Sequence, residues 1–494
     1  MTPEQITAGA RTVAHLATYF GEVKGQIGEL AAAGRASRRG YFTPGEEEEV
    51  RHLQVAYWQS RAALFEVVID FREAEKLPED RAPDAFLVAF GAAVLLVDAA
   101  RFMREAFEPL SLVRRKLNEP ESHFGIPPGT YDTVQRSLTS PRHAWHLYHA
   151  ARYFETHRDE LQRRARGPLM EPVWETIERL RRRLDVPVRR YVKARLKERS
   201  RRAVGVLRYG LLGRALWGIH KLAGSFAAEK YLRRGHRPQL PEPVLAALSK
   251  LLRPGDVILT RKEHALTNYF LPGYFKHAAL YLGEAEDLGR LGIADHEYVR
   301  PRWAKLLGPQ GPGPHRVLEA LKDGVWIRST ASPLRADAVA ALRPRLDPEQ
   351  LAAALARGMF HEGKPYDFDF DFTRSDRLVC TEVIYRTYDG VGGIALPLTR
   401  RAGRLTLSAQ DLIGLAVARS GFDPVGVYVP LSGPEVLTGG AAGRQLEATQ
   451  RPAGNQLPPG LVPGENGLET KSLSPNRPGQ PQTSEVSKTS EVSG

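Results

Sequence analysis

The 494-residue sequence contains a single cysteine, Cys380. One cysteine excludes an intramolecular disulfide and a zinc site built from several cysteines, so the chain is not a disulfide-built secreted module. The sequence also lacks the GxxxxGK[ST], GxGxxG and HExxH patterns, which removes the usual signals for nucleotide binding and for zinc proteases.

Long charge-free apolar runs are missing as well. The most apolar stretch, residues 85–107, is interrupted by Asp98 and Arg101, which favours a buried core helix over a membrane span. The first residues, MTPEQITAGARTVAHLATYF, lack the basic start, apolar core and small-residue cleavage site of a secretory signal. We therefore expect a cytoplasmic protein.

Positive charge is plentiful, with a formal net charge of +13, and much of the excess lies between Arg163 and Arg237. Within it, residues 178–236 combine dense arginines with an apolar stretch at 204–228. This amphipathic segment has two interpretations: it binds an anionic membrane surface peripherally, or its apolar side packs on the rest of the protein. No motif for reading nucleic acid accompanies it, so we expect no specific nucleic-acid partner.

The spacing of apolar residues along the sequence predicts an α+β protein. Apolar residues at three- and four-residue spacing predict a helical domain over residues 1–177, and the basic segment and a linker follow at 178–244. Residues 245–433 alternate short β-like runs with helical patterns and are predicted to form a second domain. The β-like runs are 256–260, 277–282, 316–321 and 324–329, and the helical patterns lie at 348–358 and after Cys380. Residues 434–494 are rich in Gly, Pro, Ser, Thr, Gln and Glu, and are predicted to form a disordered tail.

Three residues of the second domain could carry chemistry. Cys380 stands at the predicted start of a helix, where the dipole and free backbone N–H groups favour a thiolate. His277 begins one β-like run, and Glu319 lies within another. Each also has a structural explanation by itself: a small buried thiol, a structural histidine and an outward-facing strand residue.

Taken together and in order, these segments resemble a known family. The segments that show the resemblance are GDVILTR (255–261), KHAALYLG (276–283), VLEALKDGV (317–325), KPYDFDFDF (364–372) and VCTEV (379–383). They are similar to the permuted papain-like amidases of the YiiX/YaeF type, which belong with the NlpC-type cysteine peptidases and the lecithin retinol acyltransferase relatives. In that group, as here, the histidine precedes the cysteine. The resemblance spans roughly residues 250–432 and leaves out the helical N-terminal domain and the tail.

The resemblance implies a role for each residue. Cys380 corresponds to the nucleophile, His277 to the general base and Glu319 to the orienting carboxylate, with Glu297 and Glu284 as weaker rivals for the third role. Tyr366 corresponds to a pocket residue, and the Gly255–Asp256 pair to the turn that opens the first barrel strand. Two departures concern the pocket: Val379 replaces an aromatic residue before the cysteine, and Thr381 replaces a serine after it.

The implied activity is that of a thiol hydrolase or acyltransferase of a bacterial type. It would act on an amide or ester bond in a cell-wall-type peptide or an acyl lipid, through an acyl-enzyme on Cys380, and needs neither a metal nor an organic cofactor. The alternative is a non-catalytic scaffold that uses its basic helical region to bind a membrane or nucleic acid.

The alternating carboxylates of Asp367, Asp369 and Asp371 are a separate feature. They could bind a divalent cation, but a solvated edge strand or loop is the simpler interpretation.

Overall fold

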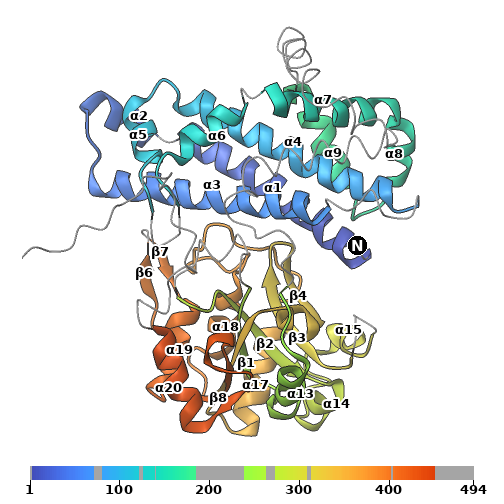
Figure 1. Cartoon of the computed structure of the whole chain (residues 1–494), viewed down its shortest axis with the longest axis vertical. Coiled ribbons are helices and arrows are strands. Elements are labelled where there is room, and N and C mark those ends of the chain that lie inside the picture. The colour runs from blue at the N-terminus through green and yellow to red at the C-terminus, as the bar shows by residue number, and fades with distance from the viewer. Residues whose placement is uncertain are drawn as a thin grey trace, which may run out of the picture. The chain divides into compact units, whose positions relative to one another are not determined.

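The computed structural model describes residues 3–29, 31–71, 80–121, 126–138, 141–184, 238–262, 273–308, 313–401 and 404–450. Those up to residue 184 form a helical region, and those from 238 to 450 a sheet region (Figure 1). Both lie within one compact unit, Met1–Asn455. The α+β class predicted from the sequence is thus confirmed.

The helical region has no strand within its described residues. Its helices are α1 (Pro3–Glu29), α2 (Ala31–Arg39), α3 (Pro44–Asp70), α4 (Ala82–Phe107), α5 (Ser111–Leu117), α6 (Thr130–Leu138), α7 (Pro141–Thr156), α8 (Arg158–Arg164) and α9 (Glu171–Leu180), followed by a 3₁₀ turn at Arg181–Leu184.

Helix α3 shows how the local sequence sets a boundary. The Thr43 hydroxyl accepts from the backbone N–H of Glu46, and the Glu46 carboxylate accepts from the backbone N–H of Thr43. This reciprocal pair satisfies donors that the first turn leaves free, and Pro44 at the first helical position suits the same geometry.

Helix α4 is the core of the helical region, as its composition predicts. It is the one helix among the described residues that is long and apolar enough to cross a membrane, yet most of its apolar window is buried inside the protein. Its Asp98 is 1% exposed and pairs with Lys24 and Arg183, so the charge that interrupts the apolar run is neutralised in the interior.

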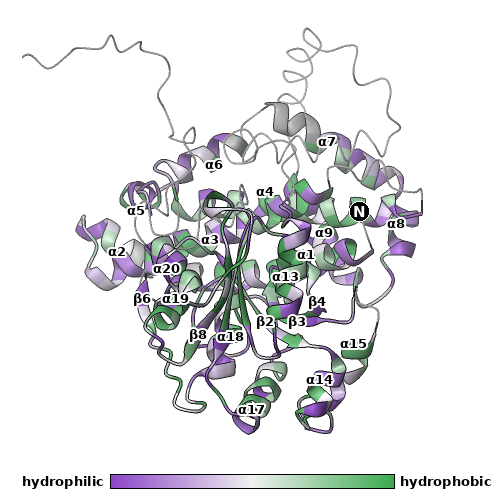
Figure 2. Cartoon of the chain, turned by 60° about the horizontal axis from the view of Figure 1, so that its bottom comes forward, coloured by the Kyte–Doolittle hydropathy of each residue, from purple (hydrophilic) through white to green (hydrophobic). Residues whose placement is uncertain are grey.

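The sheet region is built on a seven-stranded antiparallel sheet in the order β4-β3-β2-β1-β5-β8-β9. Its strands are largely hydrophobic (Figure 2), and residues on both faces are buried. The strands are β1 (Val257–Arg261), β2 (His277–Gly283), β3 (Arg316–Leu321), β4 (Gly324–Ser329), β5 (Ala338–Pro344), β8 (Phe422–Tyr428) and β9 (Leu437–Thr438); a separate hairpin pairs β6 (Thr399–Arg401) with β7 (Arg404–Thr406).

Helices surround this sheet. Helix α18 begins at Cys380 and packs on β2 and β3, and α17 packs on α18. The helices are α13 (Glu242–Leu251), α14 (Ala285–Arg290), α15 (Trp303–Leu307), α16 (Ala331–Leu334), α17 (Pro348–Met359), α18 (Cys380–Tyr388), α19 (Ala409–Val417) and α20 (Gly439–Gln450).

The predicted tail boundary at residue 434 is wrong. Residues 437–438 form β9 beside β8, and α20 packs on α19 and β8 with Ala442 and Leu446 fully buried. These few apolar residues suffice because the helix needs only one buried stripe. Residues 451–494 lie outside the described part of the chain.

Most of the basic segment, residues 185–236, also lies outside the described part of the chain. Its first residues, 178–184, belong to the helical region. There Arg181 pairs with Glu178 at 3.1 Å and Arg183 with Glu105 at 2.8 Å, so both arginines serve internal ion pairs.

Candidate active site

The turn at Gly255 and Asp256 fixes the start of β1. Gly255 has φ +91°, a conformation that favours glycine, and its carbonyl accepts from the buried Tyr388 hydroxyl of α18. Asp256 is fully buried, and its carboxylate accepts from Arg343 at 2.8 Å. This structural pair therefore ties β1 and β5 to the helix that carries the cysteine.

Cys380 is the first residue of α18 and is 4% exposed. The backbone N–H groups of a first helical turn have no partner within the helix and are free to bind a negative charge. Burial opposes ionisation of the thiol, but hydrogen bonds with His277 and with the backbone N–H groups of Ala278 and Thr381 outweigh it and lower the pKa of Cys380.

His277 is the first residue of β2, directly across the ladder from Thr260 of β1. Its Nε2 lies 2.9 Å from Oε2 of Glu319, which leaves Nδ1 for the thiol. Burial disfavours the charged ring, yet the hydrogen bonds with Cys380 and Glu319 prevail and raise the pKa of His277 to about 9. Histidine and cysteine thus shift each other's pKa in the direction that favours proton transfer from the thiol to the imidazole.

Glu319 lies in the middle of β3 and is 1% exposed. Burial alone would raise its pKa, but hydrogen bonding to His277 and the charge of Arg328 act the other way and hold the pKa at about 2. The Ser332 hydroxyl donates to its second oxygen, Oε1. The carboxylate is thus ionised and fully engaged, as an orienting residue must be.

The structure brings together Cys380, His277 and Glu319, the three residues predicted from the sequence. It does not bring the two rivals to them: Glu284 caps α14 and lies 3.4 Å from His315, and Glu297 is exposed. Ser332 and Arg328 were missed, because neither a short helix after β4 nor an arginine within β4 carries a local signal of contact with Glu319.

A pocket opens beside the cysteine. Apolar side chains supply much of its wall, and Lys276 and Arg401 add basic groups, of which Arg401 is paired with Asp411 at 2.8 Å. Burial and the nearby Arg261 lower the pKa of Lys276 to about 7. The lining residues are Phe275, Lys276, Phe370, Cys380, Thr381, Arg401, Thr406, Leu407, Ser408 and Ala409.

Tyr366, the predicted pocket residue, does not line this pocket directly. Burial raises its pKa, and the charge of Cys380 adds to the effect. Its ring packs 5.0 Å from that of Phe368. Phe370 from the same YDFDFDF stretch reaches the pocket instead, and the aromatic residues interleaved with the aspartates were the signal that could have found it.

The aspartates of that stretch lie in a loop, as one form of the simpler interpretation has it, but they are buried or half-buried and not solvated as that interpretation assumes. Asp367 is fully buried, Asp371 is 6% exposed, and their partners are backbone N–H groups and the side chains of Thr373 and Arg404. No group of three or more His, Cys, Asp or Glu side chains with metal-binding geometry occurs among the residues that the structure describes.

A half-buried histidine held by a buried carboxylate, beside a thiol at a helix start, is the arrangement of a cysteine hydrolase. Residues 251–424 match the model of a family described as permuted papain-like amidase enzymes, YaeF/YiiX, C92 family. The resemblance predicted from the sequence is thereby confirmed for this region, and a cysteine hydrolase of the amidase or peptidase kind is supported. No curated protein and no solved structure matches the chain, so the permuted papain-like fold is supported by the family match alone.

Proposed function

We propose that the protein is a thiol hydrolase in which Cys380 is the nucleophile, His277 the general base and then acid, and Glu319 the residue that orients the imidazole. The observation that carries the proposal is the 2.9 Å contact between His277 Nε2 and Glu319 Oε2. The family match to residues 251–424 supports it independently.

The proposed reaction is acyl transfer through a thioester. His277 Nδ1 takes the thiol proton, and the Cys380 thiolate attacks the carbonyl carbon of an amide or ester. The bond from that carbon to the leaving nitrogen or oxygen breaks, and the imidazolium returns the proton to the leaving group. Water, activated by the same imidazole, then releases the acid and restores the thiol. The backbone N–H of Cys380 would bind the oxyanion.

The substrate class in this proposal is an amide- or ester-bearing molecule, either a cell-wall-type peptide or an acyl lipid. Apolar pocket residues such as Phe275 and Leu407 favour a substrate with an apolar group next to the scissile carbonyl. An acceptor other than water would make the same thioester the intermediate of an acyltransferase.

Alkylation of the only cysteine tests the dyad. The rate with iodoacetamide is measured across pH for the wild type, for His277→Ala and for the control His157→Ala, whose ring bonds a backbone carbonyl within the helical region at 3.0 Å. We expect the wild type and the control to react well below the ordinary thiol pKa of about 8.5, and His277→Ala to lose that advantage. Ordinary thiol behaviour in all three proteins would overturn the proposal.

We also propose that the basic segment attaches the protein peripherally to an anionic membrane from the cytoplasmic side. The support is the sequence of the segment alone: arginines for headgroup phosphates and an adjoining apolar stretch for the interface. Flotation with vesicles containing phosphatidylserine should be lost on deletion of residues 185–236, a cut that spares α9 and the ion pairs of Arg181 and Arg183. Equal flotation of both chains would contradict this attachment.

A further inference from the structure

The aspartate loop, defined as residues 366–376, connects α17 to the cysteine helix and supplies Phe370 to the pocket of Cys380. Phe370 has φ +53°, and it is one of two non-glycine residues with positive φ in the described part of the chain. A bulky aromatic residue adopts this left-handed conformation only where its surroundings impose it.

Asp367 imposes the left-handed conformation of Phe370 from within the loop. Its carboxylate accepts from the backbone N–H of Asp369 at 2.9 Å and from that of Asp371 at 2.6 Å. These two donors lie on either side of Phe370, so one buried carboxylate closes the loop around the residue that enters the pocket.

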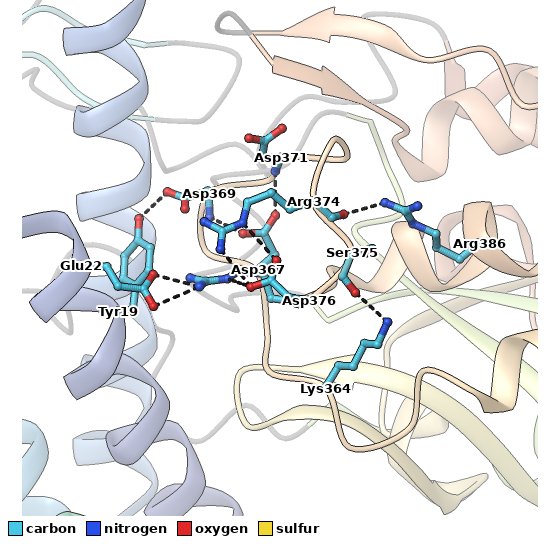
Figure 3. A network of polar contacts seen from close by, with 11 residues as sticks. Tyr19, Glu22, Lys364, Asp367, Asp369, Asp371, Arg374, Ser375, Asp376 and Arg386 are labelled. Carbon is cyan, nitrogen blue, oxygen red and sulfur yellow. Dashed lines mark hydrogen bonds and ion pairs between the residues drawn. The ribbon is translucent and has the colours of Figure 1, made fainter. Parts of the chain in front are cut away.

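The helical region holds the same loop from outside, as Figure 3 shows for Tyr19 and Glu22 of α1. The Tyr19 hydroxyl donates to Asp369 Oδ1 at 2.6 Å, and His52 Nε2 of α3 lies 3.5 Å from that oxygen. Arg377, just past the loop, pairs with Glu22 at 2.8 Å. Helices far away in the sequence thus restrain the wall of the pocket.

The sheet region completes the restraint. Arg404 of β7 donates to Asp371 at 2.7 Å, and Arg386 of α18 donates to the carbonyl of Phe372 at 2.9 Å. The loop is therefore held by the helical region at Asp369, by the β6–β7 hairpin at Asp371, and by the cysteine helix at the carbonyls of Phe372 and Arg374.

We propose that Phe370 is a specificity-determining residue that packs against an apolar acyl group of the substrate, and that Tyr19, acting through Asp369, is a positioning residue for it. The proposal rests on Cys380 being the nucleophile, as proposed above. It gives the helical region a part in substrate selection, since the Phe370 ring shares the pocket wall with the apolar side chains of Phe275 and Leu407. The favoured substrate is an amide or ester whose acyl part carries an aromatic or aliphatic group.

Two alkylating probes of different size test the inference. Iodoacetamide needs only the thiol, whereas N-benzyliodoacetamide adds an apolar ring that has to lie in the pocket. The measured quantity is the ratio of the second-order rate for the benzyl probe to that for iodoacetamide, which cancels changes in the reactivity of the sulfur itself. Phe370→Ala should lower the ratio roughly tenfold, as expected for a lost apolar contact, and Phe370→Leu should lower it less.

Tyr19→Phe tests the positioning role, because it removes the hydroxyl that bonds Asp369 and keeps the ring. Its control is Tyr131→Phe, which removes a buried hydroxyl bonded to the Met103 carbonyl within the helical region. Tyr19→Phe should lower the ratio several-fold and the control should not. A fall in melting temperature without a change in ratio would assign Tyr19 to stability alone and overturn its positioning role.

The two proposals fail in different ways. If the ratio is the same in the wild type, Phe370→Ala and Phe370→Leu, Phe370 does not determine specificity, even where the pH profile with iodoacetamide supports the dyad. If instead His277→Ala leaves that pH profile unchanged, the proposed nucleophile is lost, and with it the catalytic meaning of the pocket.

Discussion

Glu319 Oε2 lies 2.9 Å from His277 Nε2, and the carboxylate that makes this contact is 1% exposed. Its charge stabilises the imidazolium, and the imidazolium in turn stabilises the thiolate of Cys380. The reactivity of the sulfur therefore depends on a residue that does not touch it.

Glu319→Gln should raise the pH midpoint of Cys380 alkylation by about one unit or more, because a neutral amide no longer favours the protonated ring. The rate with iodoacetamide across pH measures the midpoint. Glu284→Gln is the matched control, since that rival carboxylate lies 3.4 Å from His315 and not near the cysteine. A shift in the control and none in Glu319→Gln would transfer the orienting role to Glu284.

Gly255→Ala should destabilise the protein by roughly 2–4 kcal/mol, since the residue combines a left-handed backbone with close packing. Its φ is +91°, and a Cβ would meet Leu351 Cδ1 at 2.4 Å. Gly363→Ala is the control, with φ +96° and nothing within 4 Å of the added atom. Urea denaturation of both variants separates the two costs: the control should lose only the backbone part, and equal losses would exclude a packing cost at residue 255.

The environment of Glu382 leads us to expect that the free energy of unfolding falls as the pH rises. This carboxylate is fully buried, and its Oε1 accepts from Arg386 at 2.9 Å. Burial raises its pKa to about 8 against the pull of Arg386. A carboxyl whose pKa rises on folding binds its proton more tightly in the native state, so the free energy of unfolding falls as the pH rises from about 4.5 toward 8.

Glu382→Gln should remove part of this slope and gain on the order of 2 kcal/mol over the wild type near pH 8. Asp367, whose pKa burial raises to about 7, should keep the remainder. Urea denaturation between about pH 5 and pH 8 checks the slope, with Glu178→Gln as control because ion pairs with Arg158 and Arg181 lower the pKa of that carboxyl despite its partial burial. An unchanged slope in Glu382→Gln would show that other groups cause it.

The sequence predicted much of the fold, because the signals of the main elements are local. Strands β1 to β4 were predicted to within a residue or so, from the runs at 256–260, 277–282, 316–321 and 324–329. Helices α17 and α18 were also expected where they occur. Their alternating or helically spaced apolar residues set each element without reference to the rest of the chain.

The contacts between distant segments could not be predicted in this way. Nothing near Tyr19 indicates that its hydroxyl bonds Asp369, because 350 residues separate them. Asp367 looked like a solvated carboxylate, since an aspartate that closes a loop by accepting backbone N–H groups has no distinctive spacing. The candidate residues themselves were found from their order in a family pattern, which encodes the three-dimensional neighbourhood that single residues do not.

Helix α20 contributes to the folded core, although the composition of this stretch predicted disorder. Leu446 is fully buried against α19 and β8, whereas Leu431, fifteen residues earlier, is 95% exposed. Leu446→Ala should therefore cost about 2–5 kcal/mol of unfolding free energy through lost burial and a cavity, and Leu431→Ala close to nothing. Urea denaturation of the two variants measures the difference. We also expect a chain ending at residue 433 to be less stable than one ending at 450. If α20 contributed nothing to the folded core, neither substitution would change the free energy of unfolding, and the two shortened chains would be equally stable.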